Sequence, residues 1–281
     1  MSIVDNKTIQ KRQNEDSLLS IQYASRVFFN KAEMYNGFAW YASWLSAIIT
    51  FIPSTSVISL ILVTLTIIFI CMTKKYVRMA AKLRKYFDSY VLDIQSNLFC
   101  ESECREIKEQ ARRICAKDPQ KADMQKKNTG RDTPPGVREW YEFSKELVGL
   151  DAQFECQLQN TWWNKEMSKH RLLKNFGWTA VVLVIVILMS QHHHTLTLIL
   201  PAISAILAKL IERTIENCKY LDLSKKIEHW QELLEDNLTI KGIEKLQVLI
   251  DKRRSINVLE LGNFHKKVAN ELSRRYEHIT S

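Results

Sequence analysis

Two long stretches without a charged residue constrain the fold of this chain more than any other feature. Residues 34–73 and 175–208 contain no Asp, Glu, Lys or Arg. One membrane-spanning helix needs about 20 apolar residues, so each stretch is long enough for two short spans. Polar residues interrupt both stretches near the middle, at Pro53–Ser56 and at Gln191–His194. The pattern predicts two transmembrane helical hairpins. Two buried hairpins of a soluble helical core are the alternative, but soluble cores rarely need four such runs in pairs.

The hairpins divide the chain into five regions, and its composition predicts that all of them are helical. Gly and Pro are scarce, with seven and five among 281 residues, and helix formers dominate. The predicted regions are an N-terminal cytosolic helix (1–35), the first hairpin (36–73), a cytosolic helical region (74–174) with a flexible loop at 117–136, the second hairpin (175–211) and C-terminal cytosolic helices (212–281). The predicted fold class is therefore all-α, an integral membrane protein whose cytosolic domain is built from extensions of the spans.

The distribution of basic residues predicts the orientation in the membrane. The two turns between spans carry no Lys or Arg, whereas the other flanks are basic. The basic flanking residues are Lys31, Lys74, Lys75, Arg78, Lys165, Lys169, Arg171, Lys174, Lys209 and Arg213. The positive-inside rule then places both termini and the middle region in the cytoplasm. The net charge of +9 also suits an anionic ligand or lipid head groups on the cytosolic side.

An amphipathic helical pattern continues from the second span into the cytosol. No Gly or Pro interrupts Val57 to Leu98, and a single helix of this length is about 60 Å long. Its charged face carries Lys75, Arg78, Lys82, Arg84, Lys85 and Asp88. Residues 1–12 are polar and are expected to be loose. Turn-forming residues over 117–136 predict either a linker or a mobile loop above a binding site.

None of the common motifs of an enzyme or a metalloprotein occurs in the chain. It has no Gly-rich phosphate loop, His-Glu-x-x-His, Gly-x-Ser-x-Gly or Cys-x-x-Cys. Five of the six Cys fall in predicted cytosolic regions, where thiols stay reduced. Three adjacent His at 192–194 point in different directions on any regular backbone, so we expect them to keep the outer turn polar. We therefore predict no catalytic residues, no metal and no cofactor.

The uncharged stretches 34–73 and 175–208 contain no Asp, Glu, Lys or Arg, and this argues against a secondary transporter, which usually has ionisable groups at mid-membrane. Hydroxyl groups are the polar side chains that remain. They belong to Ser43, Ser46, Ser59, Thr64, Thr66 and Ser204. These residues either line a pore or satisfy contacts between helices, and the second interpretation is the more common use of such residues.

A cytosolic cluster of aromatic and basic residues is the candidate ligand site. Its members are Arg138, Trp140, Tyr141, Gln157, Asn160, Trp162, Trp163, Lys169 and Arg171. Aromatic rings stack on nucleobases and guanidinium groups bind phosphates. Trp and basic residues also anchor helices at a membrane interface, and that alternative applies to Trp162 and Trp163 in particular. The candidate ligand-binding residues are therefore Arg138, Trp140, Tyr141, Gln157, Asn160 and Arg171.

Several short motifs accompany the hairpins: Ile9-x-x-x-Gln13-Asn14 followed by Leu18 and Leu19, then Trp140-Tyr141, and Cys156-Gln157-x-x-Asn160-x-x-Trp163. In these motifs and in its first hairpin the chain resembles the SMODS-associated four-transmembrane effector family of bacteria. The resemblance implies an effector of antiphage defence that works beside a nucleotide cyclase or polymerase. A cyclic oligonucleotide would bind the cytosolic region, and the membrane region would then disrupt the inner membrane by forming a pore, causing growth arrest or death.

These observations predict a non-enzymatic, ligand-gated membrane effector. Its expected partners are the lipid bilayer, a cyclic oligonucleotide and further copies of the chain, because four short spans enclose little room for a pore. Direct binding of DNA or RNA is not expected. The alternative is a membrane-anchored scaffold whose cytosolic helices recruit a partner protein without conductance.

Overall fold

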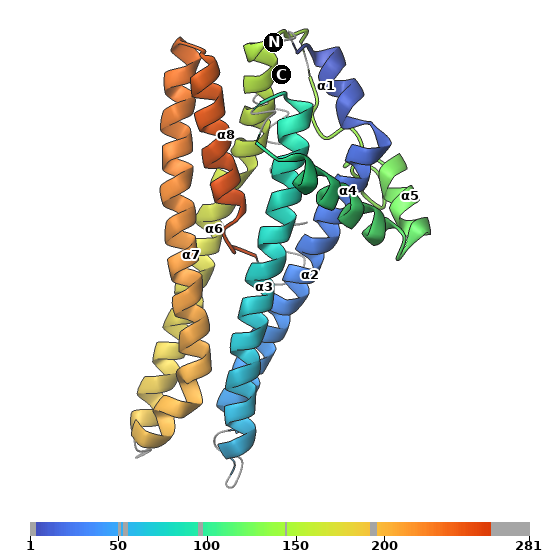
Figure 1. The fold of residues 1–281 in the computed structure, drawn as a ribbon. Helices are drawn as coiled ribbons and strands as arrows, with labels where there is room; N and C mark the ends of the chain where they lie inside the picture. Colours follow the sequence, from blue (N-terminus) through green and yellow to red (C-terminus); the bar gives the residue numbers. More distant parts are fainter. Residues whose placement is uncertain are drawn as a thin grey trace. The chain divides into compact units, whose positions relative to one another are not determined.

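The described part of the chain is helical. The computed structural model describes residues 4–49, 52, 56–94, 98–143, 145–191 and 196–259, apart from the side chains at 56, 162–170, 185–186, 189–191 and 196–202. Its helices are α1 (Asn6–Gln13), α2 (Asp16–Ile49), α3 (Ser56–Val91), α4 (Glu101–Cys115), α5 (Pro119–Lys127), α6 (Leu150–Gln191), α7 (Leu196–Asp236) and α8 (Ile240–Arg254) (Figure 1). No strand occurs in these ranges, so the all-α prediction is confirmed.

The chain forms two compact units. Unit 1 consists of Met1–Asn30, Tyr76–Trp162 and Leu223–Ser255, and unit 2 of Lys31–Lys75, Trp163–Asp222 and Ile256–Ser281. Each of the four long helices, α2, α3, α6 and α7, has residues in both units. The uncharged stretches fall in unit 2 and the candidate ligand cluster falls mainly in unit 1.

Unit 1 has a continuous apolar core to which the short helices contribute. In α4, Ile107, Ala111 and Ile114 recur at helical spacing and are buried, while the charged residues face outward. The carboxylate of Glu103 accepts a hydrogen bond from the backbone N–H of Cys100 at 3.2 Å, which satisfies a free donor at the start of the helix. This part of the predicted helical region 74–174 is therefore helical.

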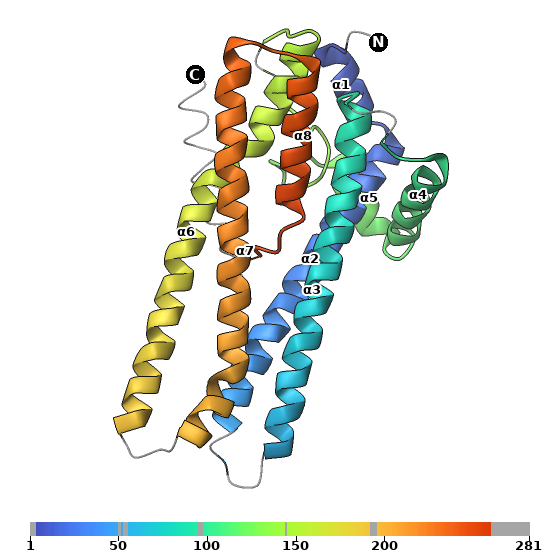
Figure 2. The ribbon, with the colours of Figure 1, turned by 60° about the vertical axis from the view of Figure 1, so that its left-hand side comes forward.

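Helices α7 and α8 pack against each other within unit 1 (Figure 2). The chain reverses direction after Asp236, where α7 ends. The hydroxyl of Thr239 accepts a hydrogen bond from the N–H of Gly242 at 3.1 Å and begins α8. Apolar residues from both helices, among them Ile227, Leu234 and Leu246, share the unit 1 core. The part of the predicted last helical region beyond 259 lies outside the described residues.

Three segments differ from their predicted local structure. Residues 6–13 form α1 rather than a loose end, because the carboxylate of Asp5 caps the helix through the Thr8 N–H at 2.8 Å. Within the predicted loop at 117–136, α5 begins at Pro119, with Asp118 as its cap. Aspartate and proline therefore start a helix here instead of a turn. Finally, α3 ends at Val91 and not at Leu98, and Asp93 adopts a left-handed backbone conformation (φ 54°) just beyond it.

Unit 2 contains a smaller apolar cluster and an exposed apolar surface. Trp40, Val182 and Ile206 are among the buried members of the cluster. Many other apolar side chains in this unit face outward, for example Val57 and Leu60. One helix among the described residues, Val57–Val91, is long and apolar enough to cross a membrane, with a mean hydropathy of 2.4 in its best window. The two-hairpin arrangement therefore stays a prediction.

Hydroxyl side chains in the uncharged stretches form hydrogen bonds within the protein. Ser46 and Ser59 lie 3.1 Å apart, on α2 and α3. Ser43, Thr64 and Thr66 donate to carbonyls three or four residues earlier on their own helices. This pattern supports the interpretation that hydroxyls in these helices satisfy helix contacts.

Candidate functional site

Residues 138–141 form the centre of the candidate site, and the end of α1 fixes their backbone. The side-chain amide of Gln13 donates to the Tyr141 carbonyl at 3.0 Å and accepts from the Tyr141 N–H at 2.8 Å. The Asn14 side chain accepts from the Glu139 N–H at 3.2 Å. Glu139 has φ 53°, an unfavourable backbone conformation for a residue with a side chain. Gln13 and Asn14 therefore hold this segment in a strained conformation.

The side chain of Tyr141 lies in the core of unit 1 and only 1% of its surface is exposed. Its hydroxyl donates to Oδ1 of Asp88 at 2.7 Å and accepts from Nδ2 of Asn160 at 2.8 Å. Burial and the negative charge of Asp88 raise the pKa of Tyr141 well above its ordinary value. The phenol therefore stays protonated and acts as a hydrogen-bond donor to the carboxylate.

Asp88 joins the Tyr141 side chain to α8. Its Oδ2 accepts from Nε2 of Gln247 at 3.2 Å and pairs with the Arg254 guanidinium. Gln157 of α6 reaches the same residue of α8, because its Nε2 donates to Oε1 of Gln247 at 3.1 Å. A buried carboxylate needs such partners to remain charged. The result is a polar network that links α3, α6, α8 and the 138–141 segment.

Asp251 is the second carboxylate of this network and has weaker partners. Its Oδ1 accepts from Gln247 at 3.1 Å and lies 3.5 Å from Arg254. Its Oδ2 is buried without a hydrogen-bond partner among the described residues. Burial raises the pKa of Asp251 to about 6, and the nearby charge of Asp88 adds to the effect, although Arg254 opposes it. This side chain consequently changes its charge near neutral pH.

Arg84 and Trp140 form the accessible edge of the site. The guanidinium carbon of Arg84 lies 3.8 Å from the centre of the Trp140 ring, and 39% of Trp140 is exposed. Nη1 of Arg84 is buried and has no hydrogen-bond acceptor in the described part of the chain. Burial and the positive charge of Arg254 lower the pKa of Arg84 to about 9, so the group remains a cation at neutral pH.

The arrangement offers a cation with a free donor beside an exposed aromatic face. Such a pair suits an anionic aromatic compound, with an acceptor oxygen at Arg84 and a ring against Trp140. Arg138 adds a second, half-exposed cation, whose nearest carboxylate is Glu139 at 4.0 Å. The described residues include no group of three His, Cys, Asp or Glu that could hold a metal.

The structure brings together most of the residues predicted from sequence, but in different environments. Tyr141, Gln157 and Asn160 contribute to the buried network, whereas Trp140 and Arg138 are exposed. Arg171 belongs to unit 2, and the other five candidate residues belong to unit 1. The side chains of Trp162, Trp163 and Lys169 lie outside the described set.

Sequence reasoning missed Arg84, Asp88 and Arg254. Asp88 is predicted on a solvated face, yet it is 1% exposed. Its partner Arg254 is 166 residues away, so no local spacing indicates the pair. One local feature of the sequence is compatible with the burial of Asp88: it directly follows the apolar Phe87 and precedes the apolar Val91 by three residues.

Comparison with known proteins gives one match. The family model described as the SMODS-associating 4TM effector domain matches residues 7–256, nearly the whole chain. A comparison with curated proteins finds no match, and neither does one with solved structures. The matched range includes most of each unit and every residue of the polar network.

Proposed function

The chain belongs to the SMODS-associating 4TM effector family, and from this premise we propose that a cyclic oligonucleotide gates the protein and that it then breaches the inner membrane. Family membership makes it a membrane effector of antiphage signalling. In our proposal the breach is a pore formed by several copies of the chain, and its consequence is growth arrest or death of the infected cell. A nucleotide cyclase or polymerase would supply the ligand.

The observation that carries the ligand proposal is the unsatisfied guanidinium of Arg84 beneath Trp140. A buried donor without an acceptor costs about 1–3 kcal/mol, and a phosphate oxygen would remove that cost. The exposed part of Trp140 offers a face on which a base can stack. Arg138 would contact a second phosphate. Cyclic oligonucleotides present phosphates and bases together, and so match both features.

Tyr141, Gln157 and Asn160 have a supporting role in this proposal. Their polar atoms are directed at the protein itself: Tyr141 donates to Asp88, Gln157 to Gln247, and Asn160 to the Tyr141 hydroxyl. They would fix the wall on which Trp140 lies, because Trp140 precedes Tyr141 directly in the chain. A rigid wall lowers the entropy lost when a ligand binds.

Helix α3 supplies a route from the ligand to the membrane. It carries Arg84 and Asp88 in unit 1, and without interruption it contains the apolar residues 57–72 in unit 2. We propose that both termini are cytoplasmic, as the positive-inside rule predicts. A ligand opens the protein only if it binds the open state more tightly than the closed one.

The test uses purified full-length protein in liposomes loaded with a fluorescent dye. We expect leakage on addition of one member of a cyclic oligonucleotide panel, and none without it. Arg84→Met should weaken binding of that member about 10- to 100-fold, the loss expected for a charge-assisted hydrogen bond. Arg105→Met is the matched control, because Arg105 is an exposed residue of α4 paired with Glu101, and it should bind normally.

One outcome would overturn the whole proposal, and a second would overturn the assignment of Arg84. Folded protein that binds no nucleotide of the panel and leaks under no condition would contradict gating and pore formation together. Stable co-purification with a partner protein in that case would favour the membrane-anchored scaffold. Equal affinity of the Arg84→Met and Arg105→Met variants would instead remove Arg84 from the site while leaving gating intact.

A further inference from the structure

Arg171 of α6 is buried in unit 2 and has no anionic partner among the described residues. It is 8% exposed, and both Nε and Nη1 are without a hydrogen-bond acceptor among the described residues. Its guanidinium forms a cation–π contact with Tyr220 on α7, where the guanidinium carbon lies 5.4 Å from the ring centre. Leaving a buried cation unpaired is costly, so an unpaired guanidinium indicates that its anion comes from outside the protein.

The carboxylates on the neighbouring helix already have other partners. Glu212 accepts from Lys209 at 2.8 Å and lies 3.6 Å from Lys74. Glu216 lies 3.5 Å from Lys74 and 3.6 Å from Lys219. Neither carboxylate pairs with Arg171. The acidic side chains of this part of α7 are thus occupied by lysines.

A second unsatisfied donor lies at the same level of the helix pair. Asn217 of α7 is 3% exposed, and its Nδ2 has no acceptor in the described part of the chain. Two contacts show which residues of α6 and α7 face each other. Asn175 donates to Thr214 at 2.8 Å, and Arg171, one turn before Asn175 on α6, lies over the ring of Tyr220. Asn217 lies between Thr214 and Tyr220 at three-residue spacing, on the same face of α7. Arg171 and Asn217 together offer several donors to one anion.

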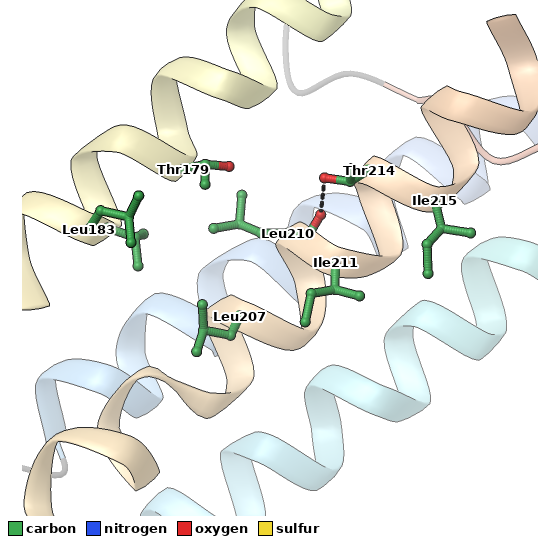
Figure 3. Close-up of a pocket in the computed structure, with 8 residues that line it drawn as sticks. Thr179, Leu183, Leu207, Leu210, Ile211, Thr214 and Ile215 are labelled. Atoms are coloured by element: carbon green, nitrogen blue, oxygen red, sulfur yellow. Dashed lines mark hydrogen bonds between the residues drawn. The ribbon is translucent and has the colours of Figure 1, made fainter. Parts of the chain in front are cut away.

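An apolar groove begins about one helical turn from Asn217 on α7 and about two turns from Arg171 on α6. It has a volume of about 220 Å³ and runs between α6 and α7, with Thr179 and Leu183 on one side and Leu207, Ile211 and Thr214 on the other (Figure 3). The hydroxyls of Thr179 and Thr214 donate to carbonyls of their own helices at 2.9 Å each. The groove therefore offers an apolar surface with few free polar groups.

We propose that this part of unit 2 binds one anionic phospholipid. The phosphate would lie against Arg171 and Asn217, and an acyl chain would lie along Leu183, Leu207 and Ile211. The groove is smaller than the about 300–1,000 Å³ of most ligand pockets and has no aromatic lining, which fits a hydrocarbon chain better than a nucleotide. Basic pockets beside membrane helices on the cytoplasmic side are common sites for lipid head groups.

This inference rests on the proposed placement of residues 175–211 in the membrane. That placement puts Asn175 at the cytosolic end of a span, so Arg171, one turn earlier, lies at the depth of the phosphates of the inner leaflet. The lipid site is separate from the nucleotide surface of unit 1 and does not depend on gating by a nucleotide.

The experiment measures lipid retention by native mass spectrometry of the full-length protein released from detergent. Delipidated protein receives phosphatidylglycerol or phosphatidylcholine with the same acyl chains. We expect one phosphatidylglycerol to be retained at least about tenfold better than phosphatidylcholine. Both lipids have a phosphate, but phosphatidylcholine also has a cationic choline group that offsets the phosphate charge. Phosphatidylglycerol has no such group, so its phosphate forms the stronger charge-assisted hydrogen bond. Equal retention of the two lipids would overturn the proposal.

Variants locate the site. Arg171→Met should lower the retention of phosphatidylglycerol about tenfold or more, whereas Lys219→Met, an exposed cation on α7, should retain it as the unmodified chain does. Should Arg171→Met fail to fold, Asn217→Leu provides the second test. It replaces an unpaired donor by an apolar side chain of similar size, so it should fold at least as well without lipid and still retain less phosphatidylglycerol. Unchanged retention in a folded Asn217→Leu variant would then reject the site.

A competition experiment identifies the source of the phosphate. Soluble glycerol 3-phosphate, at the concentration of the lipid, should not displace phosphatidylglycerol, because it lacks the acyl chain that contacts the groove. Full displacement would show a site for soluble phosphates and would overturn the lipid assignment. Dye leakage is not the readout here, so the result is independent of the outcome of the gating experiment.

Discussion

Replacing Tyr141 by Phe tests whether the buried network, rather than ligand contact, is the role of this residue. The substitution removes one oxygen and leaves the ring in place, including its stacked contact with Phe87 at 6.4 Å. It also removes two hydrogen bonds, one to the Asp88 carboxylate and one from Asn160. The backbone contacts of residue 141 with Gln13 do not involve the side chain and should persist.

The expected loss follows from the two bonds. A hydrogen bond to a charged group contributes about 1.5–3 kcal/mol and one between neutral groups about 0.5–1.5 kcal/mol. Because both bonds involve the same hydroxyl, their contributions are not fully additive, and the free energy of unfolding should decrease by about 2–4 kcal/mol. At about 2–4 °C per kcal/mol for a chain of this size, the melting temperature should fall by roughly 5–15 °C.

The assay is thermal unfolding of purified protein in detergent at pH 7, followed by intrinsic fluorescence. Tyr90→Phe is the matched control, because Tyr90 lies on the same helix and is largely exposed, so it should change the melting temperature by no more than about 2 °C. If Tyr141→Phe behaves like Tyr90→Phe in unfolding but weakens nucleotide binding, the network argument is refuted and Tyr141 contacts the ligand instead.

Two further substitutions test other parts of the site. The raised pKa of Asp251, about 6 against 3.8 in an unfolded chain, means that the folded state binds the extra proton. The protonated carboxyl of Asp251 therefore adds about 3 kcal/mol to the free energy of unfolding below about pH 4, and this contribution is lost as the pH rises through about 6. Melting curves should show this loss in the unmodified chain but not in Asp251→Asn, and an identical pH dependence of both would contradict the assignment. Gly136→Ala should destabilise the loop by about 1–3 kcal/mol, because a Cβ there would lie 1.8 Å from the carbonyl oxygen of Asn128. Gly130→Ala in the same loop meets no atom within 4 Å, so limited proteolysis should cut only the Gly136 variant faster.

The large helices were predictable because their signals are local. The first interruption, at 53–56, includes the first residue of α3, and the second, at 191–194, includes the last residue of α6. Helix α5 was missed for a local reason as well: Asp118-Pro119 is compatible with a turn and with a helix start, and the burial of Ala122 and Gln125 that favours the helix depends on the rest of unit 1.

The candidate site was predictable only in part, because its main contacts join distant residues. Periodicity assigns Asp88 and Arg84 to one charged face, yet the structure buries Asp88 against Arg254 and places Arg84 beneath Trp140. Each pair joins segments more than fifty residues apart, and a single sequence contains no spacing that reports such contacts. The aromatic and basic character of 138–141 was visible, whereas the residues that complete its surroundings were not.

The distribution of satisfied and unsatisfied groups indicates where a ligand gains its binding energy. Asp88 already has Tyr141, Gln247 and Arg254 as partners, so a ligand that approached it would have to break existing hydrogen bonds. Arg84, one turn earlier on α3, has a buried donor without an acceptor among the described residues, so an anion that reaches it gains a hydrogen bond and breaks none in return. In the proposed mechanism the nucleotide therefore acts on α3 through Arg84, and it favours whichever position of α3 brings that guanidinium closest to the bound phosphate. The hydrogen bonds of the Asp88 network oppose this movement of α3. Tyr141→Phe weakens the network and leaves Arg84 unchanged. It should therefore change the ligand concentration needed for leakage more than it changes the intrinsic affinity for the nucleotide.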